Sequence, residues 1–250
     1  MKFDKLFERM RILNCNYVAT GHYAKIELVD GKYVLKKATD KKKDQSYVLY
    51  FLNQYQLSHL LFPLGDYEKV NIRNIAKENG FTNADKKDSQ DICFVPDGDY
   101  VKVIKINATK EIKDGNIVNE NGKVLGRHKG IINYTIGQHR KLGIELDGKY
   151  FVTKIDANKN EVTLGKEEDL YSDEMFVTDV SFVSGVVPKN AFKCKVKPRY
   201  RKEESEADIH MLDDKNAKVT FKEKQRAITK GQSAVFYDGD IVLGGGGIIT

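Results

Sequence analysis

The second half of the sequence is dominated by short segments in which apolar and polar residues alternate. This period of two begins near residue 149 and predicts strands, because successive side chains of a strand point to opposite faces of a sheet. Turn residues such as Asp238-Gly239 separate the segments. The predicted strands are 149–155, 161–164, 174–182, 191–199, 206–211, 217–221, 233–237 and 240–243. Many short strands at regular spacing are typical of a small antiparallel β-barrel.

The first half of the sequence has a mixed α/β pattern. Residues 3–14 carry apolar side chains at helical spacing and predict an amphipathic helix, and a short strand at 17–20 runs into Gly21. Alternation in 25–29 and 32–36 around Asp30-Gly31 predicts a β-hairpin.

A second helix is predicted between two end signals. Asp66 is a candidate N-cap and Gly80 a candidate C-terminal stop. The apolar residues at helical spacing between them predict a buried face formed by Val70, Ile75 and Ala76.

Bulk properties restrict the class of protein. The chain of 250 residues suggests one to three domains, and its formal charge of +6 is compatible with a polyanionic partner. The cysteines Cys15, Cys93 and Cys194 are odd in number and far apart, which argues against a secreted disulfide framework and a zinc site with paired ligands. A reducing cytoplasm is therefore expected. No apolar run reaches the length of a membrane-spanning helix.

The stretch from Lys86 to Pro96 combines charged, hydroxyl, amide and thiol side chains, and it contains Cys93. Lys86 and Lys87 favour the thiolate of this cysteine, whereas Asp88 and Asp91 oppose it. Two interpretations remain open from the residues alone. Cys93 is either a nucleophile or a buried residue of a short strand at 92–95.

Basic residues gather in three places that suit a nucleic acid. In the strand predicted at 191–199, alternation puts Lys193, Lys195, Lys197 and Arg199 on one face, with Cys194 on the opposite, core face. The predicted loops 126–130 and 137–141 are also basic and flank Tyr134, a combination that suits RNA. A solvated charged face is the alternative for the strand. The glycine run 244–247 predicts a tight barrel corner, since no helix follows it to bind phosphate.

The stretch around Cys93 resembles the signature of the sulfur-carrying cysteine in the tRNA-specific 2-thiouridylases. Further blocks similar to that family follow in the family's order and cover essentially the whole chain. They are Ala19-Thr20-Gly21-His22-Tyr23-Ala24, Lys43-Asp44-Gln45-Ser46-Tyr47, Phe62-Pro63-Leu64-Gly65, Tyr134-Thr135-Ile136-Gly137-Gln138, Arg199-Tyr200, Gly231-Gln232-Ser233-Ala234-Val235-Phe236-Tyr237 and Leu243-Gly244-Gly245-Gly246. The family more often has Gln-Arg-Lys-Gly where this chain has Gln138-His139-Arg140-Lys141, so no roles are carried over to 139–141.

The resemblance implies an α+β multidomain fold. It consists of a partial α/β nucleotide-binding domain of the Rossmann-like PP-loop type, a small central domain and a C-terminal antiparallel β-barrel. The implied division assigns 1–57 and 81–99 to the remnant of the ATP-binding domain. It assigns 58–80 and 100–160 to the central tRNA-binding domain and 161–250 to the barrel.

The resemblance also implies an activity and its residues. The family uses ATP and Mg²⁺ to adenylate the wobble uridine of tRNA, and a cysteine persulfide, loaded by a cysteine desulfurase or a sulfur-relay protein, converts it to 2-thiouridine. Cys93 matches the persulfide cysteine, and Gly21 matches a residue that touches ATP. The positions that match tRNA contacts are His22, Lys43, Asp44, Gln45, Arg199, Tyr200 and Gln232.

Two family elements have no counterpart in the sequence. One is the Ser-Gly-Gly-x-Asp-Ser phosphate loop, and the other is the Asn-Pro-Cys-x-x-Cys-Asn block with the partner cysteine of a transient disulfide. Cys15 does not match that cysteine and is interpreted as structural. We therefore expect a chain that lacks the family's N-terminal region and needs it for activity. A catalytically inactive tRNA-binding module and a persulfide relay protein that accepts sulfur at Cys93 are the alternatives.

Overall fold

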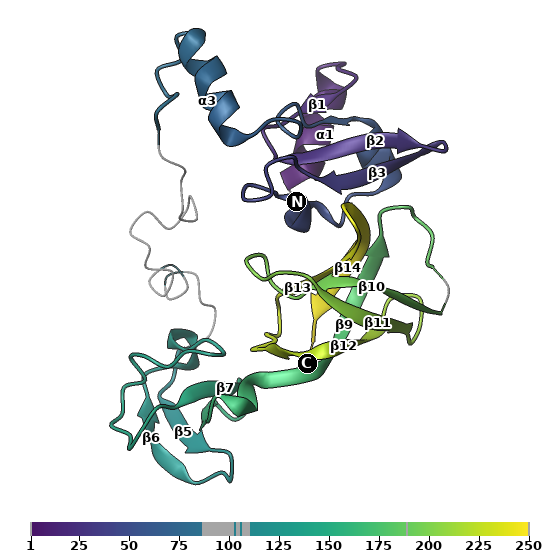
Figure 1. Cartoon of the computed structure of the whole chain (residues 1–250). Helices are drawn as coiled ribbons and strands as arrows, with labels where there is room; N and C mark the ends of the chain where they lie inside the picture. The colour runs from purple at the N-terminus through teal and green to yellow at the C-terminus, as the bar shows by residue number, and fades with distance from the viewer. Residues whose placement is uncertain (1, 87–102, 104–105, 107–110, 189, 250) are drawn as a thin grey trace. The chain divides into compact units, whose positions relative to one another are not determined.

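The structure, a computed structural model, describes residues 2–86, 103, 106, 111–188 and 190–249 (Figure 1). The chain divides into two compact units. Unit 1 comprises residues 1–86, 174–223 and 230–250, and unit 2 comprises 87–173 and 224–229.

Unit 1 begins with the predicted amphipathic helix, α1 (Lys2–Ile12). Its buried side chains are Phe3, Phe7 and Met10, and burying each of them contributes about 2 kcal/mol of transfer free energy. Strand β1 (Val18–Ala19) follows and pairs in parallel with β4 (Leu60–Leu61). The predicted hairpin is confirmed as β2 (Ala24–Val29) and β3 (Lys32–Lys37). Asp30 and Gly31 both have positive φ, as a tight two-residue turn requires.

A short apolar segment after the hairpin completes the core of this part. The 3-10 helix η1 (Ser46–Leu49) buries Tyr47 and Leu49. Helix α2 (Gln54–Ser58) begins with a capping box formed by Asn53 and Gln56. The core cluster joins α1, the hairpin and these elements to Val235, Tyr237 and Val242 of the barrel strands.

Helix α3 (Lys69–Glu78) differs from the prediction at its start and on its face. Its N-cap is Glu68 instead of Asp66, and none of its residues is buried. Val70 and Ile75, expected in the core, are 55% and 42% exposed, and Ala76 is half-buried. The predicted end at Gly80 is confirmed, since Gly80 has positive φ and the N–H of Phe81 donates to the carbonyl of Ala76.

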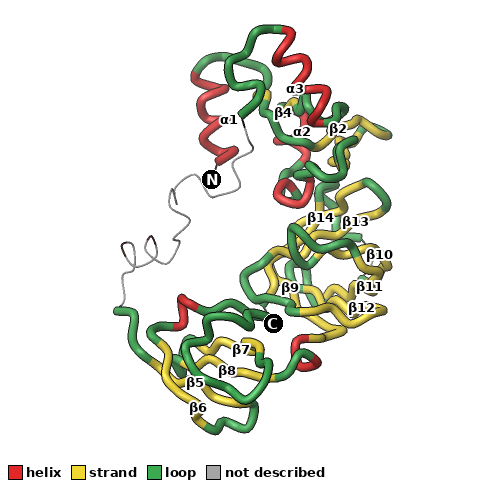
Figure 2. Tube along the Cα trace, turned by 60° about the vertical axis from the view of Figure 1, so that its left-hand side comes forward, coloured by secondary structure: helices red, strands yellow, loops and turns green. Residues whose placement is uncertain are grey.

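Six strands form the predicted antiparallel barrel (Figure 2). They are β9 (Tyr171–Phe182), β10 (Ala191–Lys197), β11 (Ser205–Met211), β12 (Ala217–Arg226), β13 (Ser233–Asp238) and β14 (Ile241–Ile248). Their order is β13-β10-β11-β12-β9-β14, and the pairing of β13 with β14 closes the barrel. A closed barrel leaves no unpaired edge.

The glycine run of β14 allows its neighbours to approach closely. A Cβ atom on Gly244 would lie 2.1 Å from the carbonyl oxygen of Ser181, and one on Gly245 would lie 2.4 Å from that of Ala234. Gly246 is equally confined, with the Thr178 carbonyl at 2.5 Å. These glycines are buried among backbone atoms within β14, where the register with β9 shifts between Gly245 and Gly247, so the predicted close packing is present inside a strand.

The barrel and the N-terminal hairpin form one sheet. Strand β14 pairs antiparallel with β3, with Ile241 opposite Lys36 and Val242 opposite Leu35. The N–H of Lys37 extends this ladder by donating to the carbonyl of Asp240 at 2.9 Å. The sheet continues into β2, so the hairpin and the barrel are placed by hydrogen bonds as well as by the shared core.

Unit 2 contains a sheet in the order β6-β5-β8-β7, and Figure 2 shows its four strands. They are β5 (Gly115–Asn119), β6 (Val124–His128), β7 (Phe151–Asp156) and β8 (Glu161–Gly165). The 3-10 helices η2 (Ile131–Asn133) and η3 (Glu168–Leu170) follow β6 and β8. Its core contains Ile117, Val152, Val162 and Leu164. Alternation alone grouped the segments 149–155 and 161–164 with the barrel, but both pair here.

The fold class expected from the resemblance is confirmed: an α/β part, a separate middle unit and a closed antiparallel β-barrel. The domain boundaries given above stay predictions.

Candidate nucleic-acid interface

The carboxylate of Asp44 organises the loop between β3 and η1. Its Oδ1 accepts hydrogen bonds from the N–H of Ala38 at 2.9 Å and of Ser46 at 3.3 Å. Its Oδ2 accepts the hydroxyl hydrogen of Ser46 at 2.7 Å. A carboxylate that accepts several internal hydrogen bonds fixes the loop around it. Asp44 therefore shapes the predicted tRNA-contacting triplet from within.

Gln45 is fixed to the segment that follows β1. Its side-chain Oε1 accepts the N–H of Tyr23 at 3.0 Å, and its own N–H donates to the Tyr23 carbonyl at 2.8 Å. Because the oxygen of the amide is used in this way, its NH₂ group is the half that can donate to a ligand. The pairing places Gln45 beside Gly21-His22-Tyr23, a separate family block.

Tyr200 joins this loop from the turn between β10 and β11. Its hydroxyl donates to the backbone carbonyl of Asp44 at 3.1 Å, and its ring lies edge-on to Tyr47 with centroids 5.7 Å apart. Burial and the nearby Asp44 carboxylate raise the pKa of the Tyr200 hydroxyl, so this hydroxyl remains a donor at neutral pH.

Tyr47 connects Tyr200 to the segment that contains Gln232, the third segment predicted to contact tRNA. Its hydroxyl donates to the carbonyl of Ser233 at 2.7 Å, one residue after Gln232. Burial raises the pKa of Tyr47 to about 12, and the Arg199 guanidinium acts in the opposite direction. The backbone of Gln232 is held in turn, since its carbonyl accepts the N–H of Ile248 at 2.8 Å. The family blocks at 43–45, 199–200 and 232 therefore lie around one tyrosine.

His22 lies between two phenylalanine rings. Its ring centroid is 5.7 Å from those of Phe3 and Phe62, and its Nδ1 is 2.8 Å from the hydroxyl oxygen of Thr20. These contacts fix the orientation of the imidazole.

Gly21 is exposed at the end of β1. A Cβ atom there would meet only Leu64 Cδ1, at an ordinary contact distance of 3.5 Å, and the φ of Gly21 is not positive. The fold therefore does not require glycine at this position, whereas close approach of a ligand to the backbone would.

The predicted four-cation face of β10 is interrupted by carboxylates of β11. Lys193 lies opposite Asp208 and Lys195 opposite Glu206 in the register, with Lys193 Nζ 3.9 Å from Asp208 Oδ1. Glu206 also pairs with Lys222 of β12, and these lysines lower the pKa of its carboxyl. The charges on this part of the face compensate one another, which favours the alternative of a solvated charged face.

The strand also ends earlier than predicted, at Lys197, so Arg199 lies in the following turn and not on the alternating face. There Lys197 Nζ is 5.9 Å from the centroid of the Tyr200 ring. Cys194 is half-buried, and burial raises the pKa of its thiol to about 12, as the core interpretation predicts. Cys15 is exposed, and its Sγ atom lies 3.7 Å from the carbonyl oxygen of Leu13, so its interpretation as structural stays a prediction.

Part of the sequence predicted as basic loops in unit 2 forms a strand, and some of its side chains make hydrogen bonds within the unit. Residues 126–128 belong to β6, and His128 is 1% exposed. Its ring nitrogens contact the N–H of Gly130 and the carbonyl of Asn160. The side chain of Gln138 closes its own turn through Thr135 and Arg140. His128 is therefore buried in unit 2, which corrects its assignment to an RNA-contacting loop, whereas the contribution of the other loop residues stays a prediction.

Cys93, the predicted sulfur carrier, lies outside the described residues. Among those that the structure does describe, no group of three or more His, Cys, Asp or Glu side chains is placed to hold a metal ion. No helix in the same ranges is long and apolar enough to cross a membrane.

Sequence reasoning missed a set of polar residues behind the interface, Lys37, Ser46, Glu204 and Tyr237. Ser46 and Tyr237 are fully buried, and their hydroxyl oxygens lie 3.4 Å apart. Both residues occur within the family blocks, but alternation alone marks Tyr237 only as a core residue. Lys37 and Glu204 carry no motif.

Comparison with known proteins covers almost the whole chain. Three family profiles match it: the tRNA methyl transferase HUP domain over residues 1–97, the tRNA methyl transferase PRC-barrel domain over 103–166, and the aminomethyltransferase beta-barrel domain over 172–248. A curated relative from Clostridium acetobutylicum, named tRNA-specific 2-thiouridylase MnmA, is 49% identical over 250 residues, which is 98% of this chain and 69% of that protein.

Relatives of the same name give the same result. The protein from Clostridioides difficile is 48% identical over 248 residues, covering 98% of this chain and 69% of its own length. A relative from Caldanaerobacter subterraneus subsp. tengcongensis, named tRNA-specific 2-thiouridylase MnmA 2, is 49% identical over 248 residues and is covered over 68% of its length. Identity at this level over three successive domains shows common descent, and the chain belongs to the tRNA-specific 2-thiouridylase family.

Proposed function

We propose that this chain binds tRNA through the interface described above and carries, on Cys93, the sulfur that converts the wobble uridine to 2-thiouridine. The observation that carries the proposal is the gathering of the 43–45 loop, the 199–200 turn and Gln232 around Tyr47. These segments are far apart in the sequence, and each matches a tRNA contact of the family.

The chemistry of the interface suits an RNA. Lys43 and Arg199 supply charge for phosphates, the NH₂ group of Gln45 can donate to a base edge, and Tyr200 presents an aromatic ring that is 41% exposed. The fixed backbone around Asp44 lowers the entropic cost of binding, because the loop is already ordered.

The sulfur step requires a sulfur nucleophile and a uridine whose oxygen at C2 has been converted to a good leaving group. The outer sulfur of a Cys93 persulfide attacks C2 of the uridine and displaces the activated oxygen at that carbon. A second thiol, which in the family belongs to the partner cysteine that has no counterpart in this sequence, then attacks the inner sulfur and breaks the S–S bond, which releases 2-thiouridine and leaves a disulfide. A two-electron reductant regenerates the thiols. A cysteine desulfurase or a sulfur-relay protein supplies the next sulfur atom.

ATP with Mg²⁺ supplies the activation of the uridine oxygen in the family, and Gly21 is the residue that the resemblance assigns to ATP. Gly21 leaves its backbone open to a ligand. Gly244, Gly245 and Gly246 are buried against β9 and β13, and the sequence has no Ser-Gly-Gly-x-Asp-Ser loop to hold phosphates. We therefore assign no step of nucleotide activation to the residues of this chain.

Sulfur loading and tRNA binding test the proposal together. The chain is incubated with a cysteine desulfurase and L-cysteine, and intact-protein mass spectrometry reports any added sulfur. A gel shift with an unmodified tRNA transcript reports binding. Cys93→Ser is expected to abolish loading and leave tRNA affinity nearly unchanged, whereas the control Cys15→Ser retains both properties.

The alternatives give different results. Loading on Cys93 without tRNA binding would identify a persulfide relay protein, and tRNA binding without loading would identify an inactive binding module. A further assay adds ATP and Mg²⁺ and measures 2-thiouridine by nucleoside mass spectrometry. Product formation by this chain alone would contradict our expectation that a phosphate-binding segment must be supplied.

A further inference from the structure

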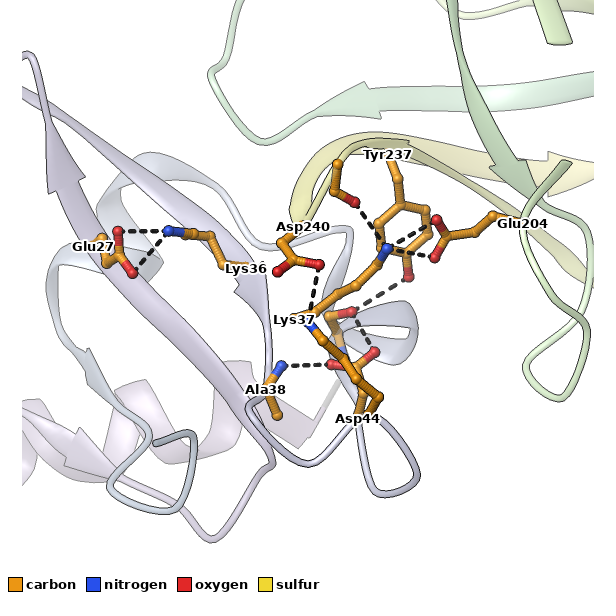
Figure 3. Close-up of polar contacts among 11 residues, drawn as sticks. Glu27, Lys36, Lys37, Ala38, Asp44, Glu204, Tyr237 and Asp240 are labelled. Carbon is orange, nitrogen blue, oxygen red and sulfur yellow. Dashed lines mark hydrogen bonds and ion pairs between the residues drawn. The ribbon is translucent and has the colours of Figure 1, made fainter. Parts of the chain in front are cut away.

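A largely buried ion pair joins the residue before the Asp44 loop to the last residue of the turn that contains Tyr200. Lys37 Nζ lies 2.7 Å from Glu204 Oε1 and 2.8 Å from Oε2, and the two side chains are only 13% and 16% exposed (Figure 3). Lys37 ends β3, immediately before the loop that contains Asp44. Glu204 ends the turn that contains Tyr200, immediately before β11.

The ammonium group of Lys37 contacts a carboxylate, a backbone carbonyl and an aromatic ring. Besides Glu204 it donates to the carbonyl of Gly239 at 2.8 Å, and it lies 4.6 Å from the centroid of the Tyr237 ring. Figure 3 shows these contacts converging from β3, the turn before β11 and the β13–β14 hairpin. An ion pair removed from water in this way gains little net stability, because the desolvation of both ions opposes their attraction.

Tyr237 links the ion pair to Asp44. Its ring packs against Lys37, and its hydroxyl oxygen is 3.4 Å from the Oγ atom of Ser46, which donates to the Asp44 carboxylate. The loop and the turn are thus joined twice. One link is the hydrogen bond from Tyr200 of the turn to Asp44 of the loop. The other is the ion pair between Lys37, which precedes the loop, and Glu204, which ends the turn.

We propose that Lys37 and Glu204 are positioning residues that hold the 38–45 loop and the 198–204 turn in the arrangement that binds tRNA. The inference rests on the proposed function. Neither residue needs to touch the RNA, since the effect of both passes through Asp44, Tyr200 and the backbone between them.

Because Glu204 is negatively charged, a positioning role and a purely electrostatic effect predict opposite changes in tRNA affinity when its charge is removed. Removing a carboxylate from an RNA-binding surface ordinarily strengthens binding, because a repulsive charge is lost. If Glu204 positions the interface, Glu204→Gln weakens binding instead. The hairpin offers a matched control, since Lys36 is adjacent to Lys37 but pairs with Glu27 at 2.9 Å within the hairpin itself (Figure 3).

The experiment measures the affinity of the full chain for an unmodified tRNA transcript by fluorescence anisotropy at several salt concentrations. Glu204→Gln and Lys37→Met are expected to weaken binding roughly five- to tenfold, the loss expected when a preordered binding surface must be reordered. The controls Glu27→Gln and Lys36→Met are expected to remain within about twofold of the unsubstituted chain.

Two further measurements separate positioning from direct contact and from misfolding. The slope of log affinity against log salt is expected to stay unchanged in Lys37→Met, whereas loss of a phosphate contact would reduce it by about 0.7–0.9. The double variant Lys37→Met/Glu204→Met removes both buried charges, so it is expected to melt near the unsubstituted chain and still bind weakly.

Specific results would overturn the inference. They are unchanged or tighter binding by Glu204→Gln, a reduced salt slope for Lys37→Met, or normal affinity in the double variant. If the unsubstituted chain binds no tRNA, the proposed function itself fails.

Discussion

The hydroxyl group of Tyr200 donates a hydrogen bond of 3.1 Å to the backbone carbonyl of Asp44, across 156 residues of sequence. This contact joins two motifs that the family resemblance assigns separately to tRNA binding. Because the acceptor is a backbone atom, the position of Tyr200 depends on the conformation of the 38–45 loop, which the Asp44 carboxylate fixes.

Removing only the hydroxyl of Tyr200 is expected to loosen this connection. Tyr200→Phe keeps the ring against Tyr47, and tRNA affinity should fall by about fivefold, the effect of one hydrogen bond of about 1 kcal/mol. The exposed Tyr67 provides the control, and Tyr67→Phe should bind normally. Equal affinity of both variants, measured by anisotropy titration, would show that the hydrogen bond does not support the interface.

Gln45 offers a test that separates folding from recognition. Gln45→Glu keeps an oxygen that accepts the N–H of Tyr23, so the melting temperature should change little. It removes the NH₂ donor and adds a negative charge, so tRNA affinity should fall about tenfold or more. Gln56→Glu adds the same charge to the same unit and also retains its acceptor role, in the capping box of α2. A matching loss in Gln56→Glu would attribute the effect to net charge alone.

Local signals predicted individual elements well and their packing partners poorly. Asp30-Gly31 between alternating segments identified the β2–β3 hairpin, because only a few turn types connect strands so tightly. The same kind of reasoning failed for Val70 and Ile75 of α3. Helical spacing shows which residues share a face, but it does not show that another element covers that face.

The interface could be predicted only as a set of separate residues. The family blocks identified Asp44 and Tyr200 as separate tRNA contacts, but they did not indicate that the two residues are hydrogen-bonded to each other. The Lys37–Glu204 pair joins residues 167 positions apart and has no local signature, since a lysine at the end of a strand is ordinarily solvated. Compensation of Lys193 and Lys195 was missed for the same reason, because cross-strand partners depend on register.

The glycine run of β14 predicts a contrast between neighbouring positions. Gly245→Ala would place a methyl group 2.4 Å from the carbonyl oxygen of Ala234, so the free energy of unfolding should fall by about 1–3 kcal/mol. Gly247→Ala meets its nearest atoms at 3.9 Å and should be nearly neutral. Denaturant titration followed by circular dichroism measures both. Similar stabilities would contradict the close approach of β13 and β14.

Burial of Cys194 predicts a dependence of stability on alkaline pH. Its pKa is raised from 9.0 to about 12, mainly by burial and also by Asp238 and Asp208, although a hydrogen bond from the backbone of Tyr237 acts against this. The unfolded state therefore loses this proton at lower pH than the folded state does. The stabilising contribution of the neutral thiol is complete below pH 9 and is lost as the pH rises toward 12.

Variants isolate this thiol from the tyrosines that titrate in the same range. The free energy of unfolding of Cys194→Ala should decline less steeply above pH 9 than that of the unsubstituted chain. Cys15→Ala, which alters an exposed cysteine, should decline as the unsubstituted chain does. Parallel curves for all three proteins would be inconsistent with a buried, neutral Cys194.

The most direct test of the tRNA interface compares two cations from one segment. Arg199 lies in the turn with Tyr200, whereas Lys195 faces Glu206 on the charge-compensated part of the barrel. Each alanine variant removes one positive charge, and anisotropy titration with an unmodified tRNA transcript measures the affinity. Our account predicts a loss of about tenfold or more for Arg199→Ala and less than about twofold for Lys195→Ala. Equal losses would show that tRNA senses only the overall charge of the barrel and would contradict a specific interface at the 38–45 loop and the 198–204 turn.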